Sequence, residues 1–163
     1  IVARLLDPNV PRDVSCVAIV GIGGLEKTTL VQLVYNDPRI KENFPWRMWT
    51  CVADQDIKHL DVKATLCKIL HSAMGEKHEH LSMDHLQKQL QEQLAGKKYF
   101  LVLDDVWNEV RDQWLELAKF LMGGLKRSWI LLTTRSEETV AAVGDEHPYK
   151  LKGLSEEDSG VYL

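Results

Sequence analysis

The stretch "VAIVGIGGLEKTTLVQLVYND", residues 17–37, joins a strand pattern to a helix pattern through a glycine-rich turn. A nearly continuous apolar, β-branched run is typical of a strand that is covered on both faces, and after the turn leucine and valine recur at helical spacing. The phosphate-binding loop reads G-x-x-x-x-G-K-[ST] in this same setting. Gly21, Lys27 and Thr28 fit that pattern, whereas Glu26 occupies the position of its second glycine.

In a phosphate-binding loop the backbone N–H groups wrap the anion, and the helix that follows directs its positive end toward it. The lysine neutralises the β- and γ-phosphate oxygens, and the hydroxyl that follows holds Mg²⁺. The residues that can supply these groups here are Gly21, Gly23, Gly24, Lys27, Thr28 and Thr29. A glycine-rich turn can also be a plain connection between a strand and a helix, so this interpretation depends on signals elsewhere in the chain.

Two later strand patterns end in charged residues. Asp104 and Asp105 close the hydrophobic run "KYFLVLDD", residues 98–105, and Arg135 follows "ILLTT". In a parallel sheet the carboxyl ends of the strands open onto the crevice that holds the ligand. We therefore predict that Asp104 supports Mg²⁺, that Asp105 orients or deprotonates a water, and that Arg135 reaches the γ-phosphate. Taken singly, the acids can also cap a loop or helix, and the arginine can be a surface residue.

Strand patterns alternate with helix patterns along the whole chain. We predict strands at 15–21, 47–53, 98–105, 129–134 and 149–154, and helices at 27–35, 60–74, 83–94, 114–121 and 137–143, with another helix beginning near Ser155. This alternation predicts an α/β fold with an open, mostly parallel five-stranded sheet that is covered by helices on both faces. The alternating pattern of the last strand predicts that it lies at an edge of the sheet.

The bulk properties are those of a single domain. The 163 residues are 45% hydrophobic and 27% charged, and the net charge of −4 gives no electrostatic reason to expect nucleic acid or an anionic membrane as a partner. No apolar run reaches the roughly 18 residues of a transmembrane helix, and the leading segment, residues 1–13, lacks the features of a signal peptide. The chain begins without Met, which suggests a piece of a longer protein.

Other conspicuous residues are predicted to be structural. Cys16, Cys51 and Cys67 are odd in number and lie in apolar stretches, which favours buried, reduced thiols in a cytoplasmic protein. His78 and His80 lie in a charged segment that is more typical of a solvated loop than of a metal site. The tryptophans at positions 46, 49, 107, 114 and 129 are predicted to pack in the core and in the seams between helices and sheet.

Five motifs together resemble the NB-ARC domain, the nucleotide-binding switch of plant disease-resistance proteins that carry leucine-rich repeats. In order along the chain they are "GIGGLEKTTL", "WTCVADQDI", "KKYFLVLDDVWNE", "ILLTTRSEETVA" and "YKLKGLSEEDS". Trp107, directly after "LDDV", is similar to the subgroup with a coiled-coil domain rather than a TIR domain at its N-terminus. The resemblance covers nearly the whole chain and implies that residues 1–163 are the nucleotide-binding subdomain of a larger receptor.

The resemblance implies a P-loop NTPase of the STAND group, in which the strand with the sensor arginine separates the Walker A and Walker B strands. It implies that Lys27 and Thr28 bind phosphate and Mg²⁺, that Asp104 supports the Mg²⁺, that Asp105 is the hydrolytic acid, and that Arg135 is the first sensor. The family holds ADP at rest, exchanges it for ATP on pathogen perception, then oligomerises and triggers defence and local cell death. Slow ATPase activity, a cytoplasmic location and contacts with coiled-coil, helical, winged-helix and leucine-rich-repeat domains are implied too.

Two residues depart from the family pattern. Glu26 replaces the last glycine of the loop, and Gly160 stands where tryptophan is usual. Like unit charges about 4 Å apart repel by about 1 kcal/mol in water and about 4 kcal/mol at an effective dielectric constant of 20. Because about 1.4 kcal/mol is tenfold in affinity, we expect Glu26 to weaken nucleotide binding roughly ten- to a thousandfold. Two alternatives stay open: a degenerate scaffold that no longer binds nucleotide, and a small-molecule kinase, for which no basic lid segment is visible.

Overall fold

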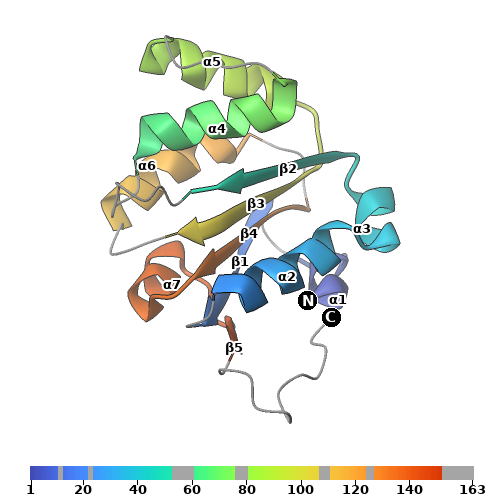
Figure 1. The fold of residues 1–163 in the computed structure, drawn as a ribbon. Helices are drawn as coiled ribbons and strands as arrows, with labels where there is room; N and C mark the ends of the chain where they lie inside the picture. Colours follow the sequence, from blue (N-terminus) through green and yellow to red (C-terminus); the bar gives the residue numbers. More distant parts are fainter. Residues whose placement is uncertain are drawn as a thin grey trace.

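The computed structural model describes residues 1–10, 13–21, 24–52, 61–75, 81–106, 111–123 and 127–151. Its strands form one five-stranded sheet in the order β2-β3-β4-β1-β5. The strands are β1 (Val14–Gly21), β2 (Trp46–Cys51), β3 (Tyr99–Val106), β4 (Ser128–Thr134) and β5 (Tyr149–Leu151). All four pairings are parallel, which confirms the predicted open sheet, and β5 lies at an edge as expected (Figure 1).

Helices cover both faces of the sheet (Figure 1). They are α1 (Val2–Leu5), α2 (Gly24–Tyr35), α3 (Pro38–Asn43), α4 (Val62–Met74), α5 (Met83–Leu94), α6 (Arg111–Leu121) and α7 (Glu137–Val143). The helices α1 and α3 were not predicted, because four and six residues are too few to show a helical period. The start of α3 does have a local cause, since the Asp37 carboxylate accepts a hydrogen bond from the Arg39 N–H and Pro38 follows the cap.

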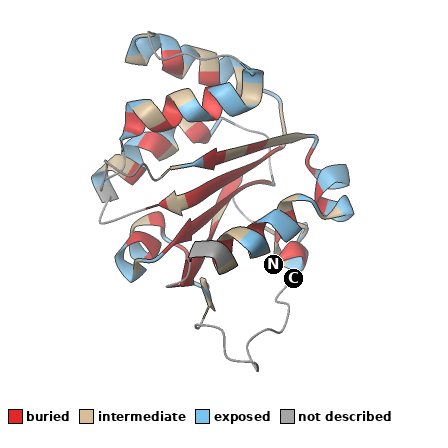
Figure 2. Cartoon of the chain, in the orientation of Figure 1, coloured by how far each residue is buried: buried red, intermediate tan, exposed pale blue. Residues whose placement is uncertain are grey.

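The core consists of two apolar layers, one on each face of the sheet. Alternate residues of a strand point to opposite faces, so Leu101 and Leu103 of β3 pack with α4, α5, α6 and α7, whereas Phe100 and Val102 pack with α1, α2 and α3. Figure 2 shows the buried central strands between these layers. Burial on both faces explains why the strands appear in the sequence as continuous apolar runs.

Two predictions about side chains need correction or refinement. Cys51 is exposed rather than buried, because it ends β2 at an edge of the sheet, and Cys16 and Cys67 are only half-buried. No disulfide joins the three. The tryptophans in α6 and β4, Trp114 and Trp129, are buried in the core as predicted, whereas those of β2 at positions 46 and 49 are half-buried.

Some predictions fall outside the described residues. These are the second part of the last strand beyond Leu151, the helix expected after Ser155, and residues 78, 80, 107 and 160. Among the helices that the structure describes, none has the length and apolar character needed to cross a membrane.

Candidate functional site

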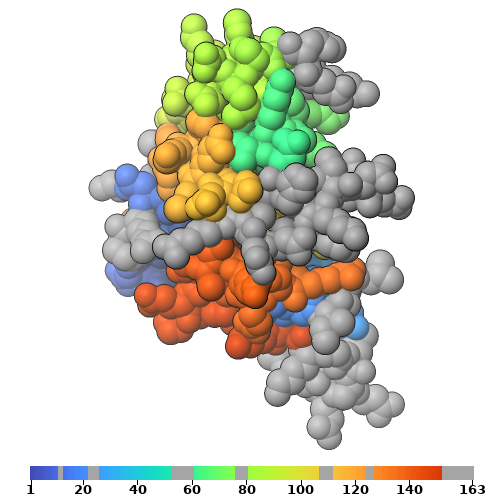
Figure 3. All heavy atoms as spheres, turned by 90° about the vertical axis from the view of Figure 1, so that its left-hand side faces the viewer, coloured from blue at the N-terminus to red at the C-terminus, as the bar shows by residue number. Residues whose placement is uncertain are grey.

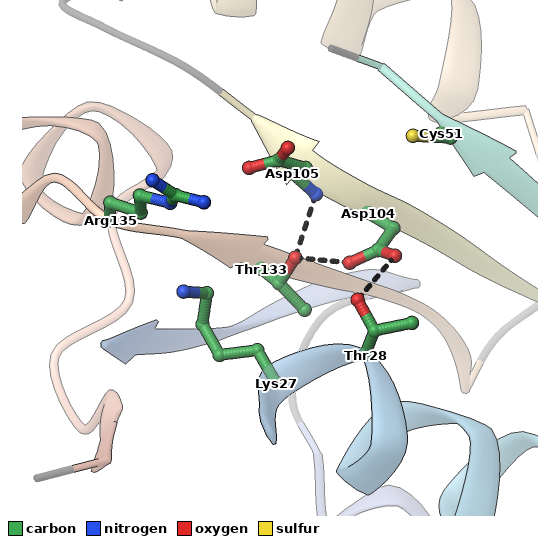
Figure 4. Close-up of a pocket in the computed structure, with 7 residues that line it drawn as sticks. All are labelled: Lys27, Thr28, Cys51, Asp104, Asp105, Thr133 and Arg135. Carbon is green, nitrogen blue, oxygen red and sulfur yellow. Dashed lines mark hydrogen bonds between the residues drawn. The ribbon is translucent and has the colours of Figure 1, made fainter. Parts of the chain in front are cut away.

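The strands β1, β3 and β4 are neighbours, and β4 lies between the other two. This is the order that the resemblance implied, with the strand before Arg135 separating the glycine-loop strand from the strand with the two acids. Figure 3 views the molecule from the side toward which the carboxyl ends of the strands point in Figure 1. A pocket of about 310 Å³ opens there, and its lining residues are Lys27, Thr28, Cys51, Asp104, Asp105, Thr133 and Arg135 (Figure 4). Four of the predicted site residues and Arg135, the predicted sensor, therefore meet in one cavity.

The first turns of α2 bring Lys27 and Thr28 to the pocket. The Lys27 side chain is only 1% exposed, and its ammonium donates a hydrogen bond to the Gly21 carbonyl at the end of β1. Burial lowers the pKa of Lys27, and the positive charge of Arg135 lowers it further. The carboxylates of Asp105, Asp104 and Glu26 act in the opposite direction. A buried ammonium beside a helix N-terminus is suited to bind an anion such as phosphate.

Asp104 joins three elements through its carboxylate and is only 6% exposed. Its Oδ2 accepts a hydrogen bond of 3.0 Å from the Thr28 hydroxyl, and its Oδ1 accepts one of 2.6 Å from the Thr133 hydroxyl. A hydroxyl and a carboxylate oxygen are ligands that suit Mg²⁺, which usually keeps several waters and takes one or two carboxylates together with substrate phosphates. Within the described ranges no three His, Cys, Asp or Glu side chains gather as a metal cage.

Asp105 has an unusual backbone conformation for a residue other than glycine, with φ at +62°. The register between β3 and β4 shifts between Leu103 and Val106, and the Asp105 N–H donates a 2.7 Å hydrogen bond to the Thr133 hydroxyl. Such backbone conformations cost about 1 to 3 kcal/mol and cluster at functional sites. The Asp105 Oδ1 atom is buried and has no hydrogen-bond partner among the described residues, so this carboxylate can still accept a proton or a hydrogen bond from a ligand.

Arg135 follows β4 directly and is exposed at the mouth of the pocket. Figure 4 shows its guanidinium at the same end of the sheet as Asp105 and the Lys27 ammonium. Thr29 is exposed on α2 and is not among the lining residues, and Gly23 lies outside the described residues.

Glycine is needed at position 21 for a reason that the sequence did not reveal. A Cβ atom there would lie 2.9 Å from the Leu151 carbonyl oxygen and 3.0 Å from the Leu151 Cβ. The close approach of β5 to the end of β1 therefore requires a residue without a side chain. Gly24 begins α2, three residues before Lys27.

Sequence reasoning missed two lining residues, Thr133 and Cys51. Thr133 had a visible signal in the sequence, since the doublet Thr133-Thr134 ends a mostly apolar strand just before Arg135. Cys51 pairs in register with Asp104 across β2 and β3, so its position at the pocket follows from a strand pairing that one strand alone does not show.

Glu26 lies in the first turn of α2 and is half-buried. Glu26 is not among the residues that line the pocket. Its negative charge nevertheless acts on Lys27 and raises the pKa of that ammonium. Glu26 therefore adds a negative charge that acts on Lys27.

Solved structures with a similar fold include two from Drosophila. The structure of Drosophila ORC bound to DNA contains a chain with a TM-score of 0.54 and 15% identity, and the match covers 88% of this chain and 38% of that one. A chain of Drosophila ORC bound to poly(dA/dT) DNA and Cdc6 has a TM-score of 0.57 and 9% identity, with 96% and 27% covered. At such identities the likeness concerns the fold alone, which is of the P-loop NTPase type.

Sequence relatives are plant disease-resistance proteins. Disease resistance protein RGA2 of Solanum bulbocastanum is 42% identical over 161 residues, which are 96% of this chain and 16% of the relative. Disease resistance protein RPP13 of Arabidopsis thaliana is 34% identical over 147 residues, which are 88% of this chain and 17% of the relative. The chain thus spans about a sixth of the length of these relatives. The NB-ARC domain model matches residues 1–162, and the chain belongs to the NB-ARC domain family.

Proposed function

We propose that this domain binds ADP and ATP with Mg²⁺ and serves as the nucleotide-dependent switch of a cytoplasmic plant immune receptor of the coiled-coil subgroup. One observation carries the proposal. The buried Asp104 carboxylate is held by the hydroxyls of Thr28 and Thr133 where α2, β3 and β4 meet, in the pocket that Lys27 and Arg135 also line. A buried carboxylate with neutral donors keeps its negative charge available for a cation.

Each residue of the pocket has a distinct role in this proposal. Lys27 and the N-terminus of α2 attract the phosphates, while Thr28 and Asp104 hold the Mg²⁺ that neutralises phosphate oxygens when it is bound. Asp105 orients the attacking water and accepts its proton, because its Oδ1 atom is buried and available. Arg135 senses a γ-phosphate by charge-assisted hydrogen bonds.

The product of such a switch is a conformational state rather than a chemical product. Nucleotides shift the balance between two states only if each nucleotide binds one state more tightly than the other. Reversing a 1:99 ratio of states takes a preference of about 10⁴-fold. The domains that convert this preference into a signal are the coiled-coil, helical, winged-helix and leucine-rich-repeat domains, and the ATP-bound receptor oligomerises. Hydrolysis by Asp105 is slow and returns the switch to rest.

Glu26 favours a second candidate function, a scaffold that no longer binds nucleotide. Its charge acts on the same ammonium that should attract phosphate. In the switch proposal, Glu26 weakens binding roughly ten- to a thousandfold and does not abolish it, since charge repulsion at a half-buried position costs about 1 to 4 kcal/mol.

Thermal unfolding with increasing Mg²⁺·ADP tests the two candidates. Ligand at about 100 times its dissociation constant adds about 2.7 kcal/mol of stability. We expect the natural chain to be stabilised at high ADP and Glu26→Gly at much lower ADP, with Glu26→Gln between them if charge is the main effect. Lys27→Ala is the matched control and should not respond. A response of Glu26→Gly alone establishes the scaffold, and a lack of response in both chains contradicts the nucleotide switch.

A further inference from the structure

The Thr133 hydroxyl lies between the two acids of the site and contacts both. It accepts a 2.7 Å hydrogen bond from the Asp105 N–H and donates a 2.6 Å hydrogen bond to Asp104 Oδ1. A backbone N–H can only donate, so the direction of the first bond is fixed. The single hydroxyl proton is then directed to the carboxylate, and this second bond is charge-assisted. Figure 4 shows this chain of contacts, which continues to Thr28.

The same hydroxyl replaces a missing backbone contact between β3 and β4. The regular pairing stops at Leu103 and resumes at Val106, so Asp104 and Asp105 lie in the irregular segment. There the Asp105 N–H has the Thr133 hydroxyl as its acceptor, at a residue whose φ is +62°. A buried N–H without an acceptor is unfavourable, so the side-chain hydroxyl stabilises this backbone conformation.

The backbone conformation in turn sets the direction in which the Asp105 side chain leaves β3. Its Oδ1 atom has no hydrogen-bond partner among the described residues, so the structure records no bond that would hold that oxygen by itself. Thr133 therefore acts on Asp104 directly through the carboxylate and on Asp105 indirectly through the main chain.

We propose that Thr133 is a positioning residue that sets the geometry of both acids, the Mg²⁺-supporting Asp104 and the hydrolytic Asp105, through one hydroxyl. This inference rests on the proposed function for its consequence in nucleotide binding, but the hydrogen bonds it concerns exist without nucleotide. Loss of the hydroxyl leaves the pocket and its charged residues in place. It removes the hydrogen bonds that connect Asp104 Oδ1 to the Asp105 N–H.

Three variants isolate the hydroxyl. Thr133→Val keeps the shape of the side chain and removes the hydroxyl, whereas Thr133→Ser keeps the hydroxyl. Thr134→Val is the matched control, because Thr134 is equally buried and its hydroxyl donates to the Val106 carbonyl and accepts from the Ser136 N–H, without contact to either acid.

The first readout is amide hydrogen exchange at Asp105 in the nucleotide-free chain. We expect Thr133→Val to accelerate this exchange at least about tenfold, and Thr133→Ser and Thr134→Val to leave it nearly unchanged, because local opening is controlled by the hydrogen bond that is lost. The second readout is the ratio of ADP affinities with and without Mg²⁺ in chains that also carry Glu26→Gly. That ratio should fall about tenfold in Thr133→Val alone, since a displaced carboxylate holds the cation less well.

The outcomes separate this inference from the proposed function. Unchanged Asp105 exchange in Thr133→Val, or equal acceleration in Thr134→Val, overturns the positioning role. Selective acceleration combined with no ADP binding in any chain supports the positioning role and contradicts the nucleotide switch. Selective acceleration together with a selective loss of the Mg²⁺ effect supports both.

Discussion

Two buried aspartates, Asp104 in β3 and Asp145 in the connection between α7 and β5, are held in different ways. Asp104 is 6% exposed at the end of β3 and accepts hydrogen bonds from the neutral hydroxyls of Thr28 and Thr133. Asp145 is 9% exposed just after α7, and its Oδ1 atom forms a 2.7 Å ion pair with the Arg4 guanidinium. Asp145 is therefore bonded directly to a cation, whereas the hydrogen bonds of the Asp104 carboxylate come from neutral hydroxyls and the Lys27 charge also acts on it.

The surroundings of Asp145 indicate a structural role. Its Oδ2 accepts a 2.9 Å hydrogen bond from the Ala18 N–H, one residue before β5 begins to pair with β1 at Ile19. The carboxylate thus supplies the hydrogen-bond acceptor that a paired strand would supply at Ala18. Arg4 also donates to the His147 carbonyl at 2.8 Å and lies over the rings of two neighbouring aromatic residues, Trp129 and Tyr149. These contacts fasten α1 to the edge of the sheet.

A structural acid and a site acid can both be buried and still differ in the partners that hold them. Burial of an unpaired charge is expensive, so a carboxylate that needs only to hold the fold together is best paired with a cation of the protein. A carboxylate that is held by hydroxyls at the mouth of a pocket retains the ability to bind a cation from outside. Asp104 is of the second kind.

The largest effect should follow from Asp145→Ala. This change removes the carboxylate that accepts from the Arg4 guanidinium and the Ala18 N–H, and breaking this partly buried ion pair costs about 3 kcal/mol. Urea unfolding monitored by tryptophan fluorescence measures the loss. The exposed neighbour supplies the control, since Glu146→Ala should change stability by less than about 0.5 kcal/mol. Equal stability of the two variants would refute the structural role of Asp145.

Gly21→Ala should have the next largest effect. Gly21 contacts both regions, because its carbonyl accepts from Lys27 of the pocket and its Cα lies close to Leu151 of β5. The added Cβ atom meets the Leu151 carbonyl 2.9 Å away. Relief of such a clash costs about 1 to 3 kcal/mol, so we expect the free energy of unfolding to fall by about 2 kcal/mol. The substitution should accelerate amide hydrogen exchange more at β5 than at β3. If exchange instead rises equally in all strands, the clash is not local to the β1–β5 edge.

Asp104→Asn should have a small effect on stability, within about 1 kcal/mol, because the amide keeps the shape and relieves a buried charge. This is the sharpest contrast with Asp145, whose replacement by Asn leaves Arg4 without a countercharge. Urea unfolding of Asp104→Asn and Asp145→Asn side by side makes the comparison. A loss of stability in Asp104→Asn that matches Asp145→Asn would place both acids in the structural class.

The smallest effect concerns the pH dependence of stability. The pKa of Lys27 is lowered from 10.5 by burial first and by Arg135 second, so the folded chain binds its proton less tightly than the unfolded chain. Between the folded pKa and 10.5 the unfolded chain holds more protons, and stability from this group rises with pH. We expect any stability advantage of Lys27→Met over the natural chain to shrink as pH rises toward 10.5. An advantage that grows over this range contradicts the direction of the shift.

The sequence predicted the central strands β1, β3 and β4 well because each of them is a nearly continuous apolar run. It also indicated the site, since Lys27, Asp104 and Arg135 each follow or end such a strand. It could not reveal the pairing of Arg4 with Asp145, because no local pattern connects residues at opposite ends of a chain. Thr133 was missed for a related reason: its role depends on the register shift between β3 and β4, which exists only once the strands are paired.

The most direct test of the proposed nucleotide site is a calorimetric titration of ADP into Glu26→Gly and into the same chain with Asp104→Asn, each with Mg²⁺ and with a chelator. We expect Mg²⁺ to strengthen ADP binding at least about tenfold in the first chain and to have little effect in the second. Asp145→Asn in the same background should keep the Mg²⁺ effect in its folded fraction. An equal Mg²⁺ effect with and without the Asp104 carboxylate would contradict the assignment of this acid to the metal.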